Sequence, residues 1–321
     1  METPELSAVI PMYNEADVLD RTVERVRGEL ARTGRSFEIL CIDDGSTDGT
    51  AQRLAELATR DPRIVPVTFS RNFGKEAAIL AGVELARGRA VLFLDADLQH
   101  PPELIPALLA RWDEGYEVVD AVKESRGPES WLRRRLGNLF HAVLGSTAGY
   151  DLVGASDFKL LDRQVIEALR RCPERNRFFR GLVAWVGFRV ARVPFRVAER
   201  AGGRSKWSPA ALVGYTLRNL VAFSPAPLRL VAWVGFLTVL AGAVLSAQTI
   251  YNWLAGEALT GFTTVILLQY WLCGLILVSL GVLGFYVSHL YEEQKARPVF
   301  LVRTPPSPGE SGGPRSSTEP T

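Results

Sequence analysis

The sequence has little cysteine and little net charge. Its 321 residues contain three cysteines, and 37 basic side chains nearly balance 35 acidic ones, so the net charge is only +2. Cys41, Cys172 and Cys273 are far apart and fit no metal-ligand spacing, which favours reduced, structural thiols in a protein that faces the cytosol. The balanced charge gives no electrostatic reason to expect nucleic acid as a partner.

Signals for secretion and the common phosphate-binding loops are also missing. The N-terminus has no basic stretch followed by a long apolar one, so we expect no signal peptide. The chain contains neither a Walker lysine loop nor a Gly-x-Gly-x-x-Gly turn. Any nucleotide site must therefore be built from other residues.

Charge is almost absent from two long runs near the C-terminus. Residues 228–254 carry only Arg229, and residues 262–290 carry no Asp, Glu, Lys or Arg. Each run exceeds the ~20 apolar residues that cross a bilayer, so we predict a hairpin of two transmembrane helices within residues 226–291. The alternative is a helical hairpin buried in a soluble domain, but two uncharged runs in tandem are hard to bury.

Basic residues on both sides of the hairpin predict its orientation. Arg229 stands at its start, Lys295 and Arg303 follow it, and the short link between the helices holds only Glu257. The positive-inside rule then places both termini in the cytoplasm, so we expect a multi-pass protein of the cell (inner) membrane. The last residues are rich in Pro, Ser, Gly and Glu, and we predict a disordered cytoplasmic tail over residues 292–321.

Residues 1–225 predict an α/β domain. Short apolar runs over residues 7–13, 37–42, 64–69 and 91–94 alternate with helical patterns, and the links between them are short. This order predicts a mostly parallel sheet covered by helices. Polar loops follow the carboxyl ends of the strands, and in open α/β sheets ligands bind at that edge.

Two aspartates follow the fourth apolar run with one residue between them. If the strand geometry continues, Asp95 and Asp97 point to the same side of the sheet, and so does Gln99. Oxygen ligands of this kind suit Mg²⁺ or Mn²⁺, which usually bind substrate phosphates at the same time. The alternative is an ordinary acidic loop after a buried strand.

The other loops extend the same chemistry. Asp43 and Asp44 end the second strand, and their carboxylates can hydrogen-bond to a base or a ribose. Asn72, Gly74 and Lys75 follow the third strand and can approach a phosphate or a sugar. Each loop alone could be an ordinary turn, but together with the aspartate pair they predict a pocket for a nucleoside diphosphate.

Several short segments, in this order along the chain, resemble a known family. Four of these segments resemble family 2 glycosyltransferases of the GT-A fold. They are Val9–Glu15, Ile42–Thr50, Ser70–Lys75 and Asp95–Pro102. Later segments narrow the resemblance to polyprenyl-phosphate glycosyltransferases, which include dolichol-phosphate mannose synthases and bactoprenol glucosyltransferases. These segments are Gly154–Arg163, Arg200–Trp207 and Tyr291–Pro298. The resemblance implies a GT-A nucleotide-sugar-binding domain followed by the transmembrane hairpin.

The resemblance also implies roles for individual residues. It makes Asp97 and Asp157 catalytic, with Asp157 near the acceptor and the sugar, and it makes Asp95, Asp97 and Gln99 metal ligands. Together with the loops described above, it gives a set that contacts the nucleotide sugar: Pro11, Tyr13, Glu15, Asp43, Asp44, Lys75, Asp95, Arg200, Ser205 and Lys206. His100 stands where other members often carry Asp, and we expect a solvent-facing histidine there rather than a ligand. The bactoprenol group implies a homo-oligomer, specifically a tetramer.

Two stretches between the sheet and the hairpin predict contact with the membrane surface. Residues 131–144 combine helical apolar spacing with a cluster of arginines, and residues 207–223 repeat the apolar spacing with a single charge. The alternative is two amphipathic helices packed on the sheet. At a bilayer surface, Arg126, Arg134 and Arg135 are candidates for holding an acceptor phosphate, because a guanidinium group matches phosphate geometry.

These observations predict an enzyme that transfers a sugar from a nucleotide diphosphate sugar to a polyprenyl phosphate, with inversion and a divalent metal ion. UDP-glucose and undecaprenyl phosphate are the favoured substrates, and GDP-mannose, UDP-N-acetylglucosamine and UDP-aminoarabinose stay open as donors. A processive polysaccharide synthase would need more membrane spans and a Gln-x-x-Arg-Trp motif, which the sequence lacks. A non-catalytic membrane subunit with a degenerate transferase domain would not need the intact aspartates.

Overall fold

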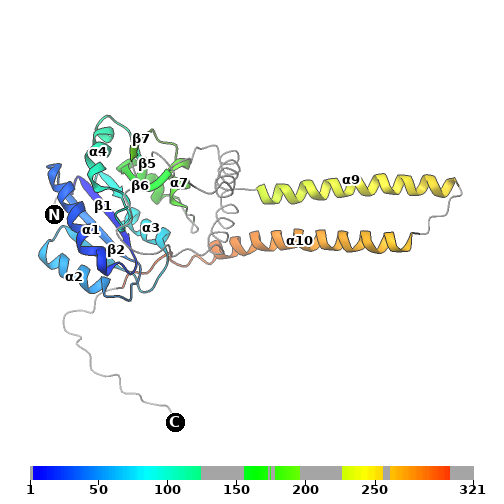
Figure 1. The fold of residues 1–321 in the computed structure, drawn as a ribbon, viewed down its shortest axis with the longest axis horizontal. Coiled ribbons are helices and arrows are strands. Elements are labelled where there is room, and N and C mark those ends of the chain that lie inside the picture. Colours follow the sequence, from blue (N-terminus) through cyan, green and yellow to red (C-terminus); the bar gives the residue numbers. More distant parts are fainter. Residues whose placement is uncertain are drawn as a thin grey trace, which may run out of the picture.

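The structure is a computed structural model that describes residues 3–123, 155–172, 174, 178–195, 226–255 and 261–303. It consists of an α/β domain and a long helical hairpin that projects from it (Figure 1). The predicted interfacial segments, residues 131–144 and 207–223, lie outside the described residues.

The α/β domain is built on a seven-stranded sheet. In spatial order the strands are β3 (Ile64–Thr68), β2 (Phe37–Asp43), β1 (Leu6–Met12), β4 (Ala90–Phe93), β6 (Ala155–Asp162), β5 (Val118–Lys123) and β7 (Val190–Phe195). Strands β1 to β4 pair in parallel, as do β5 and β7, whereas β6 runs antiparallel to its neighbours β4 and β5. The predicted α/β class with a mostly parallel sheet is confirmed.

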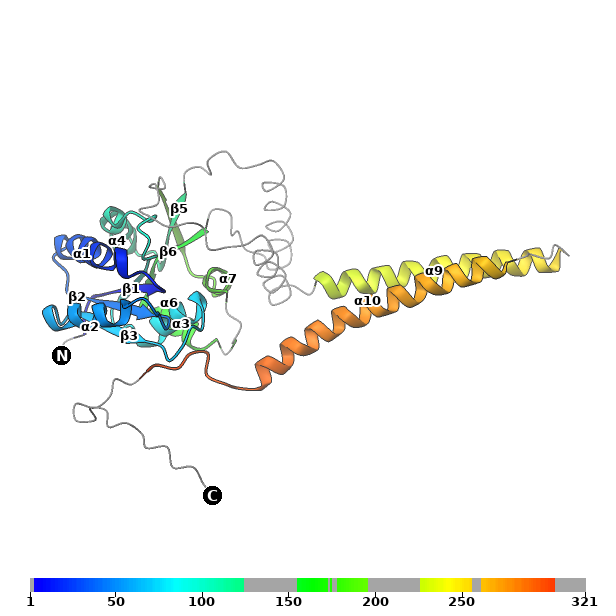
Figure 2. The ribbon, with the colours of Figure 1, turned by 60° about the horizontal axis from the view of Figure 1, so that its bottom comes forward.

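Helices cover both faces of this sheet (Figure 2). One face is covered by α1 (Ala16–Arg32), α2 (Thr50–Arg60) and α4 (Ile105–Asp113), which follows the short 3₁₀ helix η1 (Pro102–Leu104). The other face is covered by α3 (Lys75–Leu85), α6 (Arg163–Arg170) and α7 (Phe179–Trp185). Successive strand residues point to opposite faces, so Ala8 and Ile10 join the first core and Val9 joins the second. Burial on both sides explains why the strands are continuously apolar.

The strand directions gather the functional loops at one edge of the sheet. Because β1, β2, β3 and β4 are parallel, their carboxyl ends all meet that edge. Strand β6 is antiparallel to β4, with Lys159 opposite Phe93. Its amino end, which carries Asp157, therefore lies at the same edge. Asp157, the predicted catalytic aspartate of β6, thus lies at the same edge of the sheet as the loops that are predicted to bind the nucleotide and the metal.

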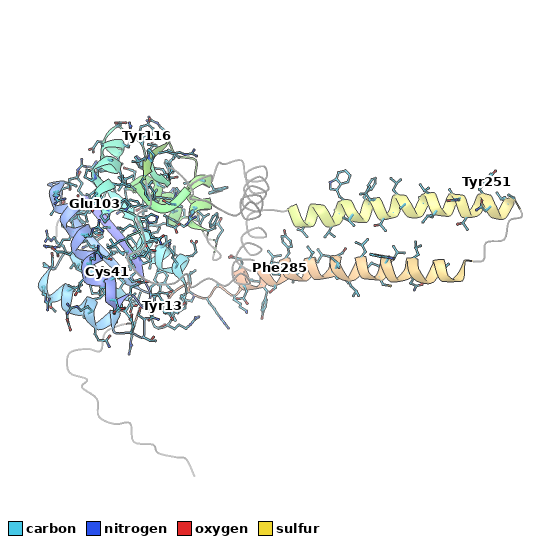
Figure 3. The ribbon with its side chains drawn as sticks, in the orientation of Figure 1. Tyr13, Cys41, Glu103, Tyr116, Tyr251 and Phe285 are labelled. Atoms are coloured by element: carbon cyan, nitrogen blue, oxygen red, sulfur yellow. The ribbon has the colours of Figure 1, made fainter. Side chains whose placement is uncertain are left out.

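The hairpin consists of α9 (Ala226–Leu254) and α10 (Phe262–Gln294). Within it, Val231–Asn252 and Trp271–Gln294 are long and apolar enough to cross a membrane, with mean hydropathies of 1.8 and 2.0. Figure 3 shows Phe285 near the α/β domain and Tyr251 at the far end. The apolar side chains along α9 and α10 are exposed rather than packed in a core. That is the opposite of a core hairpin in a soluble domain, and it supports association with a membrane.

The chain after α10 returns to the α/β domain. Val302 forms an antiparallel bridge with Phe69, just after β3, and Phe300 packs against the core on the α3 side of the sheet. The structure therefore differs from the predicted tail over residues 292–321 in its first part, because α10 continues to Gln294 and the segment that follows has apolar partners. Composition does not reveal such partners, since they come from a distant part of the sequence.

We expect Gly82→Ala to destabilise the α/β domain. Gly82 lies on α3 where this helix packs on β1, and a Cβ atom there would come within 2.3 Å of Cγ1 of Val9. Overpacking of a buried contact costs ~1–3 kcal/mol, so the thermal unfolding midpoint in detergent should fall by several degrees.

Gly28→Ala on α1 is the matched control, because a Cβ atom there meets nothing within 4 Å. Its unfolding midpoint should stay the same or rise slightly, since alanine is the better helix former. Equal midpoints for the two variants would contradict the close packing of α3 on β1.

Candidate active site

The loops after β2 and β3 are held together by a carboxylate side chain and by a close approach of their backbones. The Asp44 carboxylate accepts hydrogen bonds from the backbone N–H groups of Phe73 at 2.6 Å and Gly74 at 2.9 Å. Burial raises the pKa of Asp44, and these two hydrogen bonds oppose that shift. Gly45 has φ +69°, and a Cβ atom there would lie 2.4 Å from the carbonyl carbon of Arg71. The close approach of the two loops therefore requires glycine at this position.

The loop after β1 is tied to the loop after β2. Asn14 adopts a left-handed conformation with φ 53°. Its side-chain oxygen accepts a hydrogen bond from Thr47 N at 2.8 Å, and its own N–H donates to Ser46 Oγ at 2.8 Å. Tyr13 is exposed and Glu15 is half-buried on either side of it. The structure thus ties the loop after β1 to the loop after β2.

Within the described part of the chain, the Asp43 carboxylate at the end of β2 has one oxygen that is hydrogen-bonded and one that is not. Its Oδ1 atom accepts a hydrogen bond from Ser46 N at 3.0 Å. Its Oδ2 atom is buried, and among the described residues it has no hydrogen-bond partner. A buried acceptor without a partner is costly, so this oxygen is suited to accept a hydrogen bond from a ligand.

An ion cluster joins the β3 loop, the β4 loop and β6. The Lys75 ammonium lies 2.6 Å from Asp95 Oδ1 and 2.6 Å from Asp157 Oδ2. The structure thus places this ammonium between two carboxylates, and the contact of Lys75 with the nucleotide sugar stays a prediction. Partial loss of water around the ammonium lowers the pKa of Lys75, but the two carboxylates outweigh this effect and raise it above its ordinary value.

Arg180 on α7 belongs to this cluster, and the sequence analysis did not predict it. Its guanidinium group binds Asp157 in a fork, with Nε 2.6 Å from Oδ1 and Nη2 2.9 Å from Oδ2. Burial alone would raise the pKa of Asp157, but Lys75 and Arg180 outweigh it and hold the pKa below its ordinary value. Asp157 therefore stays ionised, with both of its oxygens engaged. No local pattern marks Arg180, because its partner lies on a different element.

Glu76 was also missed, and it positions the helix that carries Arg180. Its Oε2 atom accepts a hydrogen bond from Phe179 N at 3.0 Å, at the first residue of α7. Burial raises the pKa of Glu76 to about 7, and the charge of Asp157 acts in the same direction. Glu76 thus links the start of α3 to the start of α7, next to the ion cluster.

The Asp-x-Asp segment is a turn rather than a continued strand. β4 ends at Phe93, and Leu98 has φ 57°. Burial nevertheless alternates, so that Asp95, Asp97 and Gln99 are half-buried while the residues between them are buried. The three predicted ligands are therefore similarly accessible, but a turn carries them rather than a strand, and their common orientation stays a prediction. Tertiary contacts hold this turn, since the Thr22 hydroxyl of α1 donates to the carbonyl of Ala96 at 2.7 Å.

The prediction of a solvent-facing His100 is wrong. His100 is only 5% exposed, and its ring stacks on Phe158 at 5.4 Å and meets Phe195 edge-on at 5.6 Å. Its Nδ1 atom lies 3.8 Å from Asp95 Oδ2. The aromatic partners come from β6 and β7, which the sequence does not show to be near this loop.

The donor atoms of the turn fit a divalent cation that also binds substrate oxygens. Within the described ranges, no group of three or more His, Cys, Asp or Glu side chains is arranged to hold a metal ion. Mg²⁺ commonly uses one or two carboxylates together with phosphate oxygens. Asp95 and Asp97 are partly accessible, and the Lys75 ammonium beside Asp95 shows that positive charge is stable there. These residues therefore fit a metal ion shared with a diphosphate.

The remaining predicted site residues lie outside the described residues. They are Arg126, Arg134, Arg135, Arg200, Ser205 and Lys206. Their roles stay predictions. Pro11, Asp43, Asp44, Lys75, Asp95, Asp97, Gln99 and Asp157 are brought to one edge of the sheet, together with Tyr13 and Glu15.

We expect Glu76→Gln to remove a pH dependence of stability. The raised pKa means that ionising Glu76 costs more in the folded than in the unfolded chain, so its contribution to stability is present below about pH 4 and is lost as the pH rises through about 7. Glutamine keeps the acceptor for Phe179 N but cannot ionise. The unfolding midpoint of the wild type should therefore fall, relative to that of the variant, between pH 5 and pH 8.

Glu114→Gln, at an exposed position after α4, is the control and should keep the pH dependence of the wild type. Identical pH profiles for the wild type and Glu76→Gln would show that Glu76 titrates as an ordinary surface carboxylate.

Comparison with known proteins shows full-length relatives. The family model described as glycosyl transferase family 2 matches residues 7–170. A glycosyltransferase of Synechocystis sp. that is described as uncharacterized is 39% identical over 302 residues, covering 94% of this chain and 95% of the relative. The bactoprenol glucosyl transferase of Shigella phage SfV is 34% identical over 302 residues, covering 93% and 98%. The prophage bactoprenol glucosyl transferase homolog of Escherichia coli is 32% identical over 300 residues, covering 93% and 98%.

Solved glycosyltransferase structures align at lower identity. Glucosyl-3-phosphoglycerate synthase from Mycobacterium tuberculosis in complex with UDP is 20% identical, with a TM-score of 0.47, and the alignment covers 70% of this chain and 79% of that one. The family model covers half of the chain, and the relatives above 30% identity cover nearly all of it. The chain therefore belongs to glycosyl transferase family 2 and is a glycosyltransferase.

Proposed function

We propose that this protein transfers glucose from UDP-glucose to undecaprenyl phosphate, with inversion at the anomeric carbon. The observation that carries the proposal is the similarity to bactoprenol glucosyl transferases over more than nine-tenths of the chain, which includes both the site and the hairpin. A domain with polar loops at one edge of its sheet, joined to an apolar hairpin, suits a water-soluble donor and a lipid acceptor.

The proposed binding of the nucleotide-sugar donor rests on the loops after β1 and β2. The buried Oδ2 atom of Asp43 can accept a hydrogen bond from the N–H group of a uracil ring. Pro11, Tyr13 and Glu15 would line the same pocket, and the Asp44 carboxylate keeps the neighbouring loop in place. The family resemblance adds Arg200, Ser205 and Lys206 as residues that would hold the phosphates.

The proposed metal site rests on the turn after β4. Asp95, Asp97 and Gln99 would hold Mg²⁺ or Mn²⁺ together with oxygens of the diphosphate. When bound, a divalent cation would neutralise the negative charge that develops on the leaving diphosphate. Thr22 would keep the turn in position through its hydrogen bond to Ala96.

The acceptor needs to be positioned rather than deprotonated. A phosphate monoester has its second pKa near ~6, so it is largely dianionic at neutral pH. Asp157 is ionised and holds Lys75 and Arg180, so we assign it an orienting role. An acceptor phosphate oxygen attacks the anomeric carbon as the bond to the diphosphate oxygen breaks, and UDP leaves. One displacement of this kind inverts the configuration of the sugar.

Membrane attachment completes the proposal. The hairpin α9–α10 would anchor the enzyme in the cell membrane with both termini in the cytoplasm, and Arg126, Arg134 and Arg135 would hold the acceptor phosphate at the bilayer surface. We propose a homo-oligomer as the working form, in line with the family resemblance. An intact ion cluster at Asp157 argues against a degenerate, non-catalytic subunit.

The experiment that tests this function is transfer from a panel of radiolabelled nucleotide sugars to undecaprenyl phosphate in detergent. We expect labelled lipid from UDP-glucose in the presence of Mg²⁺ or Mn²⁺, and none with a chelator. Labelled lipid from GDP-mannose, UDP-N-acetylglucosamine or UDP-aminoarabinose instead would correct the sugar but keep the reaction. Binding of nucleotide without transfer from any donor would favour the non-catalytic subunit.

We further expect Asp97→Asn to weaken Mn²⁺ binding in the presence of UDP. Loss of residues around a metal commonly costs ~10–100-fold in affinity, and loss of a direct ligand should cost at least as much. Electron paramagnetic resonance of Mn²⁺ measures this without turnover. Asp113→Asn on α4, where Asp113 pairs with Arg35 at the surface, is the matched control. Unchanged Mn²⁺ affinity in both Asp95→Asn and Asp97→Asn would remove the metal assignment.

A further inference from the structure

The segment after the second helix of the hairpin forms a strap across the α/β domain. We define the C-terminal strap as residues 297–303, which follow the end of α10 at Gln294. Figure 2 shows this stretch running from the root of α10 back along the domain. The strap reaches the end of β3, at the same edge of the sheet as the candidate active site.

Backbone hydrogen bonds fix the strap to the start of the β3 loop. Ser70 N donates to Leu301 O at 2.9 Å, and Arg303 N donates to Thr68 O at 2.7 Å. Between these bonds Val302 pairs with Phe69 in an antiparallel bridge. The strap therefore pairs with the chain just after β3, where the chain turns into the Ser70–Lys75 loop.

An aromatic stack carries this contact from the strap into the loop. The ring of Phe300 stacks on Phe69 with a centroid distance of 5.0 Å and an interplanar angle of 13°. Phe69 in turn meets Phe73 edge-on at 5.8 Å. Each such aromatic pair contributes beyond its buried area. Phe73 thus packs against Phe69, and Phe300 of the strap packs against Phe69 in turn.

The loop held by this stack carries groups of the active site. The N–H groups of Phe73 and Gly74 donate to the Asp44 carboxylate. Lys75, the next residue, bridges Asp95 and Asp157 at 2.6 Å each. A shift of Phe73 would therefore displace both the partner of Asp44 and the ammonium between the two aspartates.

We propose that the C-terminal strap is a positioning element of the active site, in which Phe300 holds the Ser70–Lys75 loop in the conformation that places Lys75 and Asp44. Because the strap follows closely after α10, the same short segment joins the hairpin to the loop of the site. The catalytic consequence rests on the proposed function, whereas the effect on the loop does not.

The test compares Phe300→Ala with Leu301→Ala in the full-length protein in detergent. Leu301 is the matched control, because it uses its backbone carbonyl in the strap while its side chain is 52% exposed. We expect Phe300→Ala to speed hydrogen–deuterium exchange in residues 70–75 while exchange in α1 stays unchanged, and Leu301→Ala to leave both unchanged. Phe300→Tyr, which keeps the ring, should restore protection of the loop.

Transfer kinetics supply the second readout. A displacement of about 1 Å in a catalytic site can cost ~100-fold in rate, so kcat/KM of Phe300→Ala should fall by at least ~10-fold, with Phe300→Tyr near the wild type. Equal exchange in residues 70–75 for Phe300→Ala and Leu301→Ala would overturn the proposal. Absence of transfer in the wild type would refute the function but leave the exchange result standing.

Discussion

The pairing of the buried Asp157 carboxylate with two cations is the interaction on which the site depends. A charged group that is 8% exposed is unstable in a protein interior unless it is paired and hydrogen-bonded. Lys75 comes from the start of α3 and Arg180 from the start of α7, so pairing Asp157 with both cations requires the starts of these two helices to lie close together. Asp95 shares Lys75, which brings the turn after β4 into the same cluster.

The parallel strands bring the loops of the site to one edge, and a glycine lets two of these loops approach closely. Four parallel strands deliver four loops to one edge, and the antiparallel β6 delivers Asp157 to that edge from the opposite direction. Gly45 allows the β2 loop to touch the backbone of Arg71, and Asp44 then accepts two N–H groups of the β3 loop. The loops are thus held by each other, and the C-terminal strap supports them from outside.

Two parts of the molecule have opposite relations to solvent. In the α/β domain the apolar strands are covered on both faces, so the hydrophobic effect is satisfied within the domain. In the hairpin the apolar side chains are exposed along both helices. Such a surface is stable when lipid replaces water around it. The strap joins the second helix of the hairpin to the end of β3 through a few residues.

The sequence by itself determined the α/β class, the apolar hairpin, and the strand ends at which Asp43, Asp95 and their neighbours lie. These features follow from the periodicity of apolar residues and from polar residues at strand ends, which are local properties. The sequence could not show that His100 is buried against Phe158 and Phe195, that Arg180 binds Asp157, or that Phe300 returns to Phe69. Only the tertiary structure decided these contacts, because each joins residues that are separated along the chain and brought together by packing.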